Sequence, residues 1–452
     1  MTQNQQTVEQ SNHPFKDGVT TGIVHVHVHV RRPNIDPNQP ERSLDAALEE
    51  AVGLAEAISL NVVHKQIVRL NKMSPSTLMG KGNVDSIGSA IAALNIKLMI
   101  VDSTLSPIQQ RNLEKIWKCK VIDRTGLILE IFGERARTAE GSLQVELAAL
   151  KHQRSRLVRS WTHLERQRGG FGFTGGPGER QIELDRRMID NRILKIEKEL
   201  NQTIKMRSLH RKARQRNEAP VVALVGYTNA GKSTLFNKLT ESNVFAKDLL
   251  FATLDPTMRV CKLPGGREVI FSDTVGFISN LPTQLIAAFR ATLEEVCTAD
   301  VILHVHDTAH MDHEAQACDV KKVLTELGIE EESKDAPMII EVLNKADLLT
   351  NADKEILANK ISRKSNKVLI SAVTGEGLVN LLALIQRRLI EDGKIIHIEL
   401  PTYEGEILAW CYRKGVILSR YDKGEIIYLT LRLDSGEIKK FEQFKVSKKA
   451  HL

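Results

Sequence analysis

The chain has 452 residues, which is too long for one ordinary core and predicts roughly two to four domains. Hydrophobic residues make up 42% of it, enough for globular folding, although only 4% are aromatic. Five scattered cysteines without metal-ligand spacing indicate reduced thiols and argue against a disulfide-framed protein. With no signal peptide and no apolar run of about 18 residues, we expect a cytoplasmic protein without a membrane span, peripheral membrane attachment being left open.

The formal net charge of +7 is unevenly distributed along the chain. Residues 151–216 contain 18 Lys and Arg against 7 Asp and Glu, whereas the rest of the chain contains 45 basic and 49 acidic residues. Such a block can be a solvated helix face. This concentration favours contact with phosphates, and RNA is the expected partner.

The N-terminal region predicts a disordered tail followed by a strand. Residues 1–20 are polar. Residues 23–30 alternate strictly between apolar residues and histidines, so His25, His27 and His29 share one strand face. Without an acidic or cysteine partner nearby in sequence, we interpret these histidines as an exposed face and not as a metal site.

Helical and strand-like patterns alternate after this first strand. The helical patterns cover residues 44–60 and 83–94, and the strand-like patterns cover residues 62–70, 97–101 and 119–122. This alternation predicts a small N-terminal α/β domain, which we place at residues 21–138.

Residues 139–217 predict a basic, antiparallel helical hairpin. The first helix follows alternating intervals of four and three, with Arg154 at the one step that is not apolar; its apolar residues are Leu143, Leu147, Leu150, Leu157, Trp161 and Leu164. The second has Ile182, Ile189, Ile193, Ile196 and Leu200. The glycine-rich tip, residues 169–178, cannot continue a helix. Its Phe171 and Phe173 could stack on unpaired RNA bases, while a plain hinge or a protein contact stays open.

A phosphate-binding loop follows the apolar stretch 221–225. Its residues are Gly226, Tyr227, Thr228, Asn229, Ala230, Gly231, Lys232, Ser233 and Thr234. Glycines let the backbone N–H groups surround an anion. Lys232 is expected to neutralise the β- and γ-phosphates, and Ser233 to ligate Mg²⁺.

Two later motifs indicate that the base is guanine. Asn344, Lys345, Ala346 and Asp347 follow the apolar stretch 338–343. A carboxylate there accepts hydrogen bonds from guanine N1–H and the 2-amino group, donors that adenine does not offer in that arrangement. Ser371, Ala372 and Val373, after the strand-like residues 367–370, are expected to contact the guanine oxygen through the backbone.

Between these motifs lie two candidate switch segments. Asp273, Thr274, Val275 and Gly276 end a strand-like stretch; Asp273 is expected to hold Mg²⁺ through water and the Gly276 N–H to sense the γ-phosphate. Phe251, Ala252, Thr253, Leu254 and Asp255 lie upstream. There Thr253 is expected to ligate Mg²⁺ only with triphosphate bound. The four motifs together predict a GTPase domain at residues 218–392.

One departure bears on the rate of hydrolysis. Phe277 follows Gly276, where signalling GTPases place a glutamine that orients the attacking water. We therefore expect slow intrinsic hydrolysis unless a partner or an ion completes the site. Asn229 is a candidate ligand for K⁺, with a simple turn-forming role as the equal alternative. Residues 393–452 predict a small C-terminal α/β domain of unassigned role.

With these residues in view, the chain resembles the HflX family of bacterial ribosome-associated GTPases over nearly its whole length. The marks of the resemblance are residues Asp123–Leu129, Arg135–Thr138, Leu143–Ala148, Gly176–Glu179 and Phe251–Asp255. Gly175 departs from the basic residue expected in the family's tip.

The resemblance implies a multidomain α/β fold: a small N-terminal α/β domain, a helical hairpin, a P-loop GTPase domain with a mixed, mostly parallel sheet, and a small C-terminal domain. It implies a monomer that binds the large ribosomal subunit, with the tip near the peptidyl transferase centre, and splits stalled ribosomes in a GTP-dependent manner. It also implies that the motif residues above bind the nucleotide. The alternative is a non-ribosomal signalling GTPase whose coiled coil binds protein partners.

Overall fold

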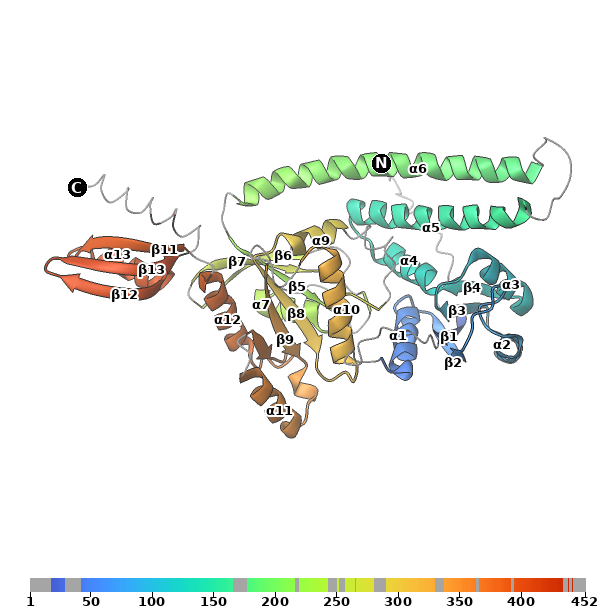
Figure 1. The fold of residues 1–452 in the computed structure, drawn as a ribbon, viewed down its shortest axis with the longest axis horizontal. Coiled ribbons are helices and arrows are strands. Elements are labelled where there is room, and N and C mark those ends of the chain that lie inside the picture. The colour runs from blue at the N-terminus through green and yellow to red at the C-terminus, as the bar shows by residue number, and fades with distance from the viewer. Residues whose placement is uncertain are drawn as a thin grey trace, which may run out of the picture. The chain divides into compact units, whose positions relative to one another are not determined.

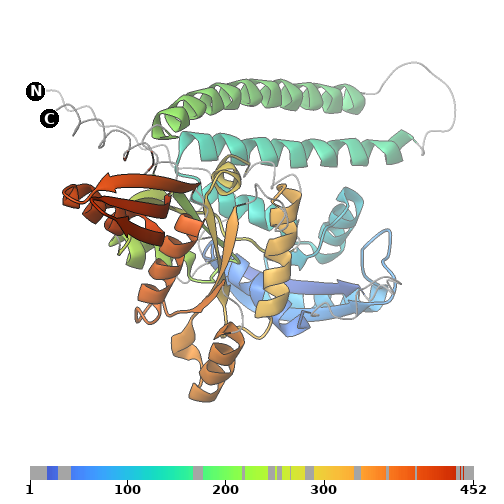
Figure 2. The same cartoon turned by 60° about the vertical axis from the view of Figure 1, so that its left-hand side comes forward.

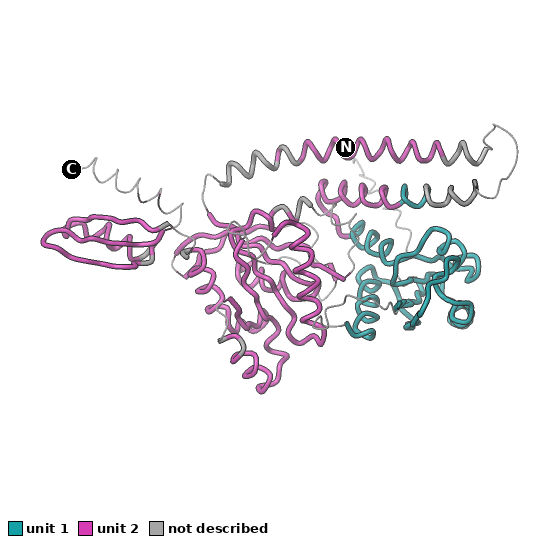
Figure 3. Tube along the Cα trace, viewed as in Figure 1, with its two compact units in different colours: residues 1–37, 42–134, 153–176 teal, residues 38–41, 135–152, 177–452 magenta. Residues whose placement is uncertain are grey.

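The computed structural model describes residues 18–28, 42–165, 177–215, 219–242, 250–251, 257–264, 266–279, 290–329, 337–362, 366–391, 394–433, 438 and 441. The chain forms two compact units (Figure 3). The first comprises residues 1–37, 42–134 and 153–176, and the second comprises residues 38–41, 135–152 and 177–452. Each unit has a largely or wholly parallel sheet of its own (Figure 1).

The first unit is built on a four-stranded parallel sheet of order β2-β1-β3-β4. Its strands are β1 (Thr20–Val28), β2 (Asn61–Leu70), β3 (Leu98–Asp102) and β4 (Lys120–Asp123). Its helices are α1 (Leu44–Glu56), α2 (Lys81–Leu94), α3 (Pro107–Trp117) and α4 (Arg124–Arg135). The predicted strands and helices of this region are confirmed. Every residue of β3 is buried, as expected for an inner parallel strand.

The prediction that the β1 histidines form an exposed face is wrong for His25. Its Nδ1 lies 2.6 Å from Oδ2 of Asp102, which ends β3, and its side chain is only 14% exposed. The two residues are 77 positions apart, so the pairing depends on the parallel register of β1 and β3. His29 lies outside the described residues.

Two helices of the hairpin, α5 (Ala139–Glu165) and α6 (Pro177–Gln215), are formed as predicted. Figures 1 and 2 both show α5 and α6 side by side. On α6 the predicted face is confirmed for Ile189, Ile193, Ile196 and Leu200, which are all buried, whereas the side chains of Ile182 on α6 and of Trp161 and Leu164 on α5 lie outside the described part. On α5 the most buried apolar residues are Val145 and Ala148, while the predicted Leu143, Leu147 and Leu150 are half-buried. Phe171 and Phe173 lie outside the described residues.

The largest sheet in the second unit has six strands in the order β10-β9-β8-β5-β7-β6. They are β5 (Val221–Gly226), β6 (Thr257–Lys262), β7 (Glu268–Asp273), β8 (Val301–Asp307), β9 (Met338–Asn344) and β10 (Lys367–Leu369). Only β6 is antiparallel to its neighbour, which confirms a mixed, mostly parallel sheet. The described helices here are α7 (Lys232–Thr240), α9 (Arg290–Cys297), α10 (His313–Glu326), α11 (Asn351–Ser362) and α12 (Leu378–Glu391).

The position of β5 decides where the sequence motifs meet. It lies between β7 and β8, and β9 follows β8. Because these four strands are parallel, their carboxyl ends form one edge of the sheet, the usual ligand-binding edge of such sheets. Gly226, Asp273, Asp307 and Asn344 each end one of these strands.

The C-terminal residues form a three-stranded antiparallel sheet of order β11-β13-β12. Its elements are β11 (Lys394–Pro401), α13 (Gly405–Lys414), β12 (Val416–Lys423) and β13 (Ile426–Leu433). Strand β12 has no alternating pattern that would predict a strand from sequence, because its apolar residues cluster at one end and its remainder is polar.

Candidate functional site

The phosphate-binding loop joins β5 to α7 through two glycines that no other residue can replace. Gly226 has φ +155°, and a Cβ there would lie 2.3 Å from the Val305 carbonyl oxygen. Gly231 has φ +89°, and a Cβ there would lie 2.3 Å from Asn344 Nδ2. Both the backbone conformation and the lack of space therefore demand glycine. The loop is held tightly against β8 and β9.

Lys232, the first residue of α7, is buried at this edge. Its Nζ donates a hydrogen bond to the Tyr227 carbonyl oxygen at 2.7 Å. Burial lowers the pKa of Lys232 to about 8, against the opposing effect of the Asp273 charge. A buried ammonium group that hydrogen-bonds a neutral carbonyl is poised to bind an anion.

Ser233 and Asp273 converge, as the Mg²⁺ prediction requires. The Ser233 hydroxyl donates to Asp273 Oδ2 at 2.7 Å, although the residues are 40 positions apart. A hydroxyl and a carboxylate are hard oxygen donors of the kind that Mg²⁺ prefers. The two side chains therefore fit a magnesium site. Thr253, the third predicted ligand, lies outside the described residues, as do Ala252, Leu254 and Asp255, whereas Phe251 is buried.

Asn344 acts as a brace between two loops. Its Nδ2 donates to the Ala230 carbonyl oxygen at 2.8 Å, and its Oδ1 accepts from the Ala372 N–H at 3.0 Å. Asn344 is buried, so both bonds are protected from water. It fixes the phosphate-binding loop relative to residues 371–373, which the sequence reading did not anticipate.

The remaining residues of this motif are more open. Asp347 is exposed, and its Oδ1 accepts from the Ser371 hydroxyl at 2.5 Å. Lys345 has φ +65°, and its Nζ pairs with Asp307 Oδ2 at 2.7 Å. Val373 is exposed beside the buried Ala372. Asp347 thus has its carboxylate positioned and accessible to a base.

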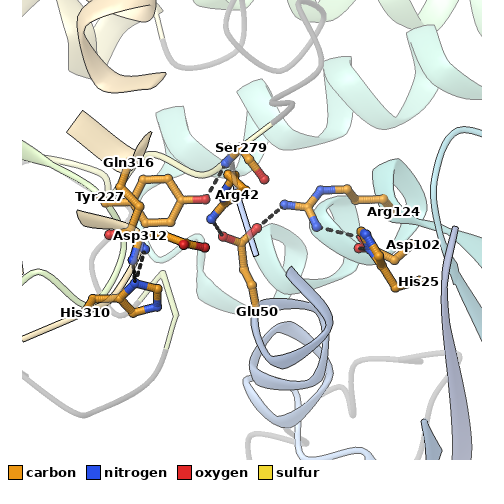
Figure 4. Close-up of polar contacts among 10 residues, drawn as sticks. All are labelled: His25, Arg42, Glu50, Asp102, Arg124, Tyr227, Ser279, His310, Asp312 and Gln316. Carbon is orange, nitrogen blue, oxygen red and sulfur yellow. Dashed lines mark hydrogen bonds and ion pairs between the residues drawn. The ribbon is translucent and has the colours of Figure 1, made fainter. Parts of the chain in front are cut away.

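A second set of contacts, missed from sequence, ties the phosphate-binding loop to the residues after Gly276. The Phe277 N–H donates to the Gly226 carbonyl at 3.1 Å, and the Thr228 N–H donates to the Phe277 carbonyl at 2.7 Å. The Ser279 N–H donates to the Tyr227 hydroxyl at 2.7 Å (Figure 4). We call these three bonds between residues 226–228 and 277–279 the clasp.

The clasp brings Gly276 and Phe277 to the loop. A Cβ on Gly276 would lie 2.9 Å from the Thr228 Cα and 3.0 Å from Lys232 Nζ, so the Gly276 backbone is next to the buried ammonium. Phe277 is itself buried, at 3% exposure. Its side chain cannot orient water as a glutamine would.

Asn229 and Thr234 complete the predicted loop. Asn229 is exposed with φ +60°, a left-handed conformation that asparagine tolerates well. Thr234 is half-buried in the first turn of α7. The structure thus brings together Gly226, Lys232, Ser233, Asp273, Gly276 and Asn344, with Asp347 and Ser371 beside them.

Comparisons with known proteins agree along the chain. Residues 45–133 match the family model described as GTP-binding GTPase N-terminal, and residues 135–214 match the GTP-binding GTPase Middle Region. Residues 221–345 match a model described as 50S ribosome-binding GTPase, and residues 356–448 match the HflX C-terminal domain.

Curated relatives are similar over most of their length. A GTPase HflX from Magnetococcus marinus is 48% identical over 83% of this chain and 85% of its own. A GTPase HflX from Escherichia coli is 45% identical over 76% of this chain and 79% of its own. A solved GTP-binding protein from Sulfolobus solfataricus in complex with GDP aligns with 82% of this chain and 98% of its own, at 24% identity and a TM-score of 0.42, a likeness too low to support an argument.

No helix among the described residues is long and apolar enough to cross a membrane. By the matches above, the chain belongs to the HflX family of GTPases, enzymes that bind and hydrolyse GTP.

Proposed function

We propose that this chain is a GTP-controlled protein that binds the large ribosomal subunit and separates the subunits of stalled ribosomes. The observation that carries the proposal is the basic hairpin directly ahead of the nucleotide site. Residues 151–216 hold 18 basic and 7 acidic residues, and residues 221–345 match a 50S ribosome-binding GTPase model. The functional parts are the proposed N-terminal domain (21–138), hairpin (139–217), GTPase domain (218–392) and C-terminal domain (393–452).

The geometry of α6 supports contact with phosphates on its outer face. Its apolar face is buried, whereas Arg186, Arg187, Lys195 and Lys198 are exposed. Helices α5 and α6 are connected by Arg192 on α6, which donates hydrogen bonds to both carboxylate oxygens of Glu146 on α5 at 2.7 and 2.8 Å. Exposed cations on a stiff helix pair can track an RNA backbone.

In the nucleotide site we assign one role to each of the following groups. Lys232 neutralises the β- and γ-phosphates, the Gly276 N–H contacts the γ-phosphate, and Asp347 reads guanine. Ser233 and Asp273 would hold Mg²⁺, with Thr253 as a third ligand in the triphosphate state. An ion held by these residues would supply positive charge to the phosphates during hydrolysis.

Hydrolysis by the isolated protein is expected to be slow, because Phe277 is buried and cannot position water. A K⁺ ion held by Asn229 would add positive charge beside the phosphates. Turnover measured in K⁺ and in Na⁺, with wild type and Asn229→Ala, tests this role. Faster turnover in K⁺ that the variant loses supports it, and equal rates in both salts refute it.

The main test is sucrose-gradient sedimentation of intact ribosomes with this protein and a non-hydrolysable GTP analogue at near-physiological salt. The proposal predicts that the intact-ribosome peak shrinks and that the protein travels with the large subunit. A variant lacking residues 169–178 should lose splitting and keep its GTP affinity. Intact ribosomes with the protein at the top of the gradient would contradict the proposal.

One observation favours a second function. Leu184, Met188 and Leu194 are exposed on α6, and Met188 is 69% exposed. Exposed apolar side chains of this kind suit a protein partner, as in a signalling GTPase. Salt separates the two functions, because RNA binding by several cations weakens steeply with ionic strength and an apolar protein interface does not.

A further inference from the structure

The C-terminal three-stranded sheet has one covered face and one open face. The covered face packs its apolar residues, among them Ile398, Leu429 and Leu431, against α13. Along β13 buried and partly exposed residues alternate, so every second side chain points away from that core. The residues on the other side, which we call the open face, are Ile395, His397, Glu399, Ser419, Tyr421, Lys423, Ile426, Tyr428, Thr430 and Arg432.

Two tyrosines occupy the open face side by side. Tyr421 on β12 is paired in register with Tyr428 on β13, the central strand. Their ring centroids are 6.4 Å apart with an interplanar angle of 40°. Tyr421 is 64% exposed, so a large aromatic ring is left in contact with water. The pair offers ring surfaces on which flat ligands can stack.

Polar groups and cations surround the tyrosine pair. In the next row His397 Nδ1 lies 3.0 Å from the hydroxyl of Thr430, and Ser419 faces Thr430 from the other strand. Lys423 lies in the row on one side of the tyrosines and Arg432 two rows away on the other side, while Glu399 is in the tyrosine row itself, paired with Tyr428. The positive charges of Lys423 and Arg432 are complementary to phosphate groups.

We propose that the open face binds single-stranded RNA, with bases stacked on Tyr421 and Tyr428. Bases supply flat rings for the tyrosines, base edges reach the hydroxyls and imidazole beside them, and phosphates meet Lys423 and Arg432. Aromatic residues on an antiparallel sheet are a common way to hold unpaired bases. Protein interfaces are also rich in tyrosine and arginine, but the hydroxyl and imidazole groups of Thr430 and His397 beside the rings, and the cation of Lys423, match base edges and phosphates. The aliphatic residues of the open face, Ile395 and Ile426, lie at its opposite ends.

The test uses the full chain with GDP and a fluorescein-labelled 12-nucleotide oligouridine in the absence of ribosomes, so it does not depend on splitting activity. Tyr421→Ala and Tyr428→Ala should each weaken binding about 5- to 100-fold, the range for loss of one stacked base. Tyr421→Phe and Tyr428→Phe keep the ring and should bind nearly as wild type does. Tyr403→Ala, which removes a tyrosine exposed outside the open face, is the matched control.

Cross-linking separates this face from the basic hairpin. Irradiation of oligouridine containing 4-thiouridine should yield adducts on peptides with Tyr421 or Tyr428, and the Ala variants should lose them. Thermal unfolding checks that the variants are folded, and the Phe variants keep the test valid if they are not. Unchanged affinity in the Ala variants, or adducts confined to residues 139–217, would overturn the proposal. The proposal would also be overturned if the Ala variants bound RNA as wild type does but lost binding to a ribosomal protein.

Discussion

The parallel sheet of the first unit and the mostly parallel GTPase sheet both collect charged side chains at their carboxyl edges and use them in opposite ways. In the first unit Arg124 is bonded to Asp102 at 2.6 Å and to Glu50, and Asp102 is bonded also to His25 (Figure 4). In the GTPase sheet Lys232 is equally buried, but its hydrogen bond goes to the neutral Tyr227 carbonyl. In the first unit the charges are paired with one another, and we call this edge the closed edge. In the GTPase sheet the ammonium is bonded to a neutral carbonyl and can still bind phosphate, so we call this edge the receptive edge.

The pKa values of the two edges show the same difference. Burial disfavours the charged form of Asp102, but the Arg124 charge and the hydrogen bonds from His25 and Arg124 outweigh it, so the pKa of Asp102 lies below its usual value. For Lys232 burial dominates, and the pKa falls to about 8. At the first edge the charged side chains stabilise one another. At the second edge burial destabilises the charged form of Lys232, and a bound phosphate would stabilise it.

Breaking the closed edge should have the largest effect. Arg124→Ala leaves Asp102 and Glu50 buried without their shared partner, so we expect the free energy of unfolding of the first unit to fall by about 3–5 kcal/mol. Urea unfolding followed by circular dichroism measures it. Because Asp102 has a lowered pKa, its contribution is present above the ordinary carboxyl pKa and is lost as pH falls through the folded value.

An exposed ion pair is the control for Arg124. Arg192→Ala removes the bidentate pair with Glu146 on the hairpin, where both side chains are about 40% exposed. Because water screens an exposed pair, that loss should lower the free energy of unfolding far less than Arg124→Ala does. An equal cost for Arg124→Ala would show that the closed edge is not held by its buried charges.

Removing the buried ammonium tests the receptive edge. Lys232→Met keeps the side-chain volume and should weaken GTP and GDP binding about 100-fold, since the phosphates lose a desolvated counter-charge. Isothermal titration calorimetry measures the affinity. Lys238→Met, on the exposed side of the same helix, should bind as wild type does. Unchanged affinity in Lys232→Met would remove Lys232 from the phosphate site.

The base contact is expected to rank next. Asp347→Asn replaces an acceptor with an amide that can also donate, so guanine loses one of its two hydrogen bonds and affinity for GDP should drop at least tenfold. Xanthosine diphosphate, which has a carbonyl where guanine has the 2-amino group, should gain affinity. Competition against a fluorescent GDP analogue measures both. Ser371→Ala, which removes only the hydroxyl that orients Asp347, should have a smaller effect.

The pH dependence of binding follows from the lowered pKa of Lys232. In the free protein the ammonium loses its proton as pH rises through about 8, whereas bound phosphate favours the charged form. Affinity for GDP should therefore be constant below pH 7 and fall towards a tenfold loss per pH unit above pH 8. Lys232→Met should show no such slope. A wild-type affinity that is flat up to pH 9 would contradict the lowered pKa.

Much of the receptive edge could be predicted from sequence, because its signals are local. Gly226, Gly231 and Lys232 lie within seven residues of one another, and strand patterns place Asp273 and Asn344 at the same edge. What the sequence could not show are pairings across long separations. The bond between the Tyr227 hydroxyl and Ser279 spans 52 residues, and that between His25 and Asp102 spans 77. The domain boundaries stay predictions.

The smallest expected effect concerns the clasp, which connects the receptive edge to the residues that follow Gly276. Tyr227→Phe removes one hydroxyl and leaves the ring, so the Ser279 N–H loses its acceptor and the two backbone bonds of the clasp are no longer supported by the third. One such bond contributes about 1 kcal/mol, which corresponds to roughly a fivefold change. The Thr228 N–H is occupied by Phe277 in the clasped form, so a looser clasp should free it for phosphate. We therefore expect Tyr227→Phe to change the ratio of GTP to GDP affinity about fivefold in favour of GTP, measured by calorimetry with a non-hydrolysable GTP analogue and with GDP. Equal changes for both nucleotides would show that the clasp supports the fold of the loop and does not respond to the γ-phosphate.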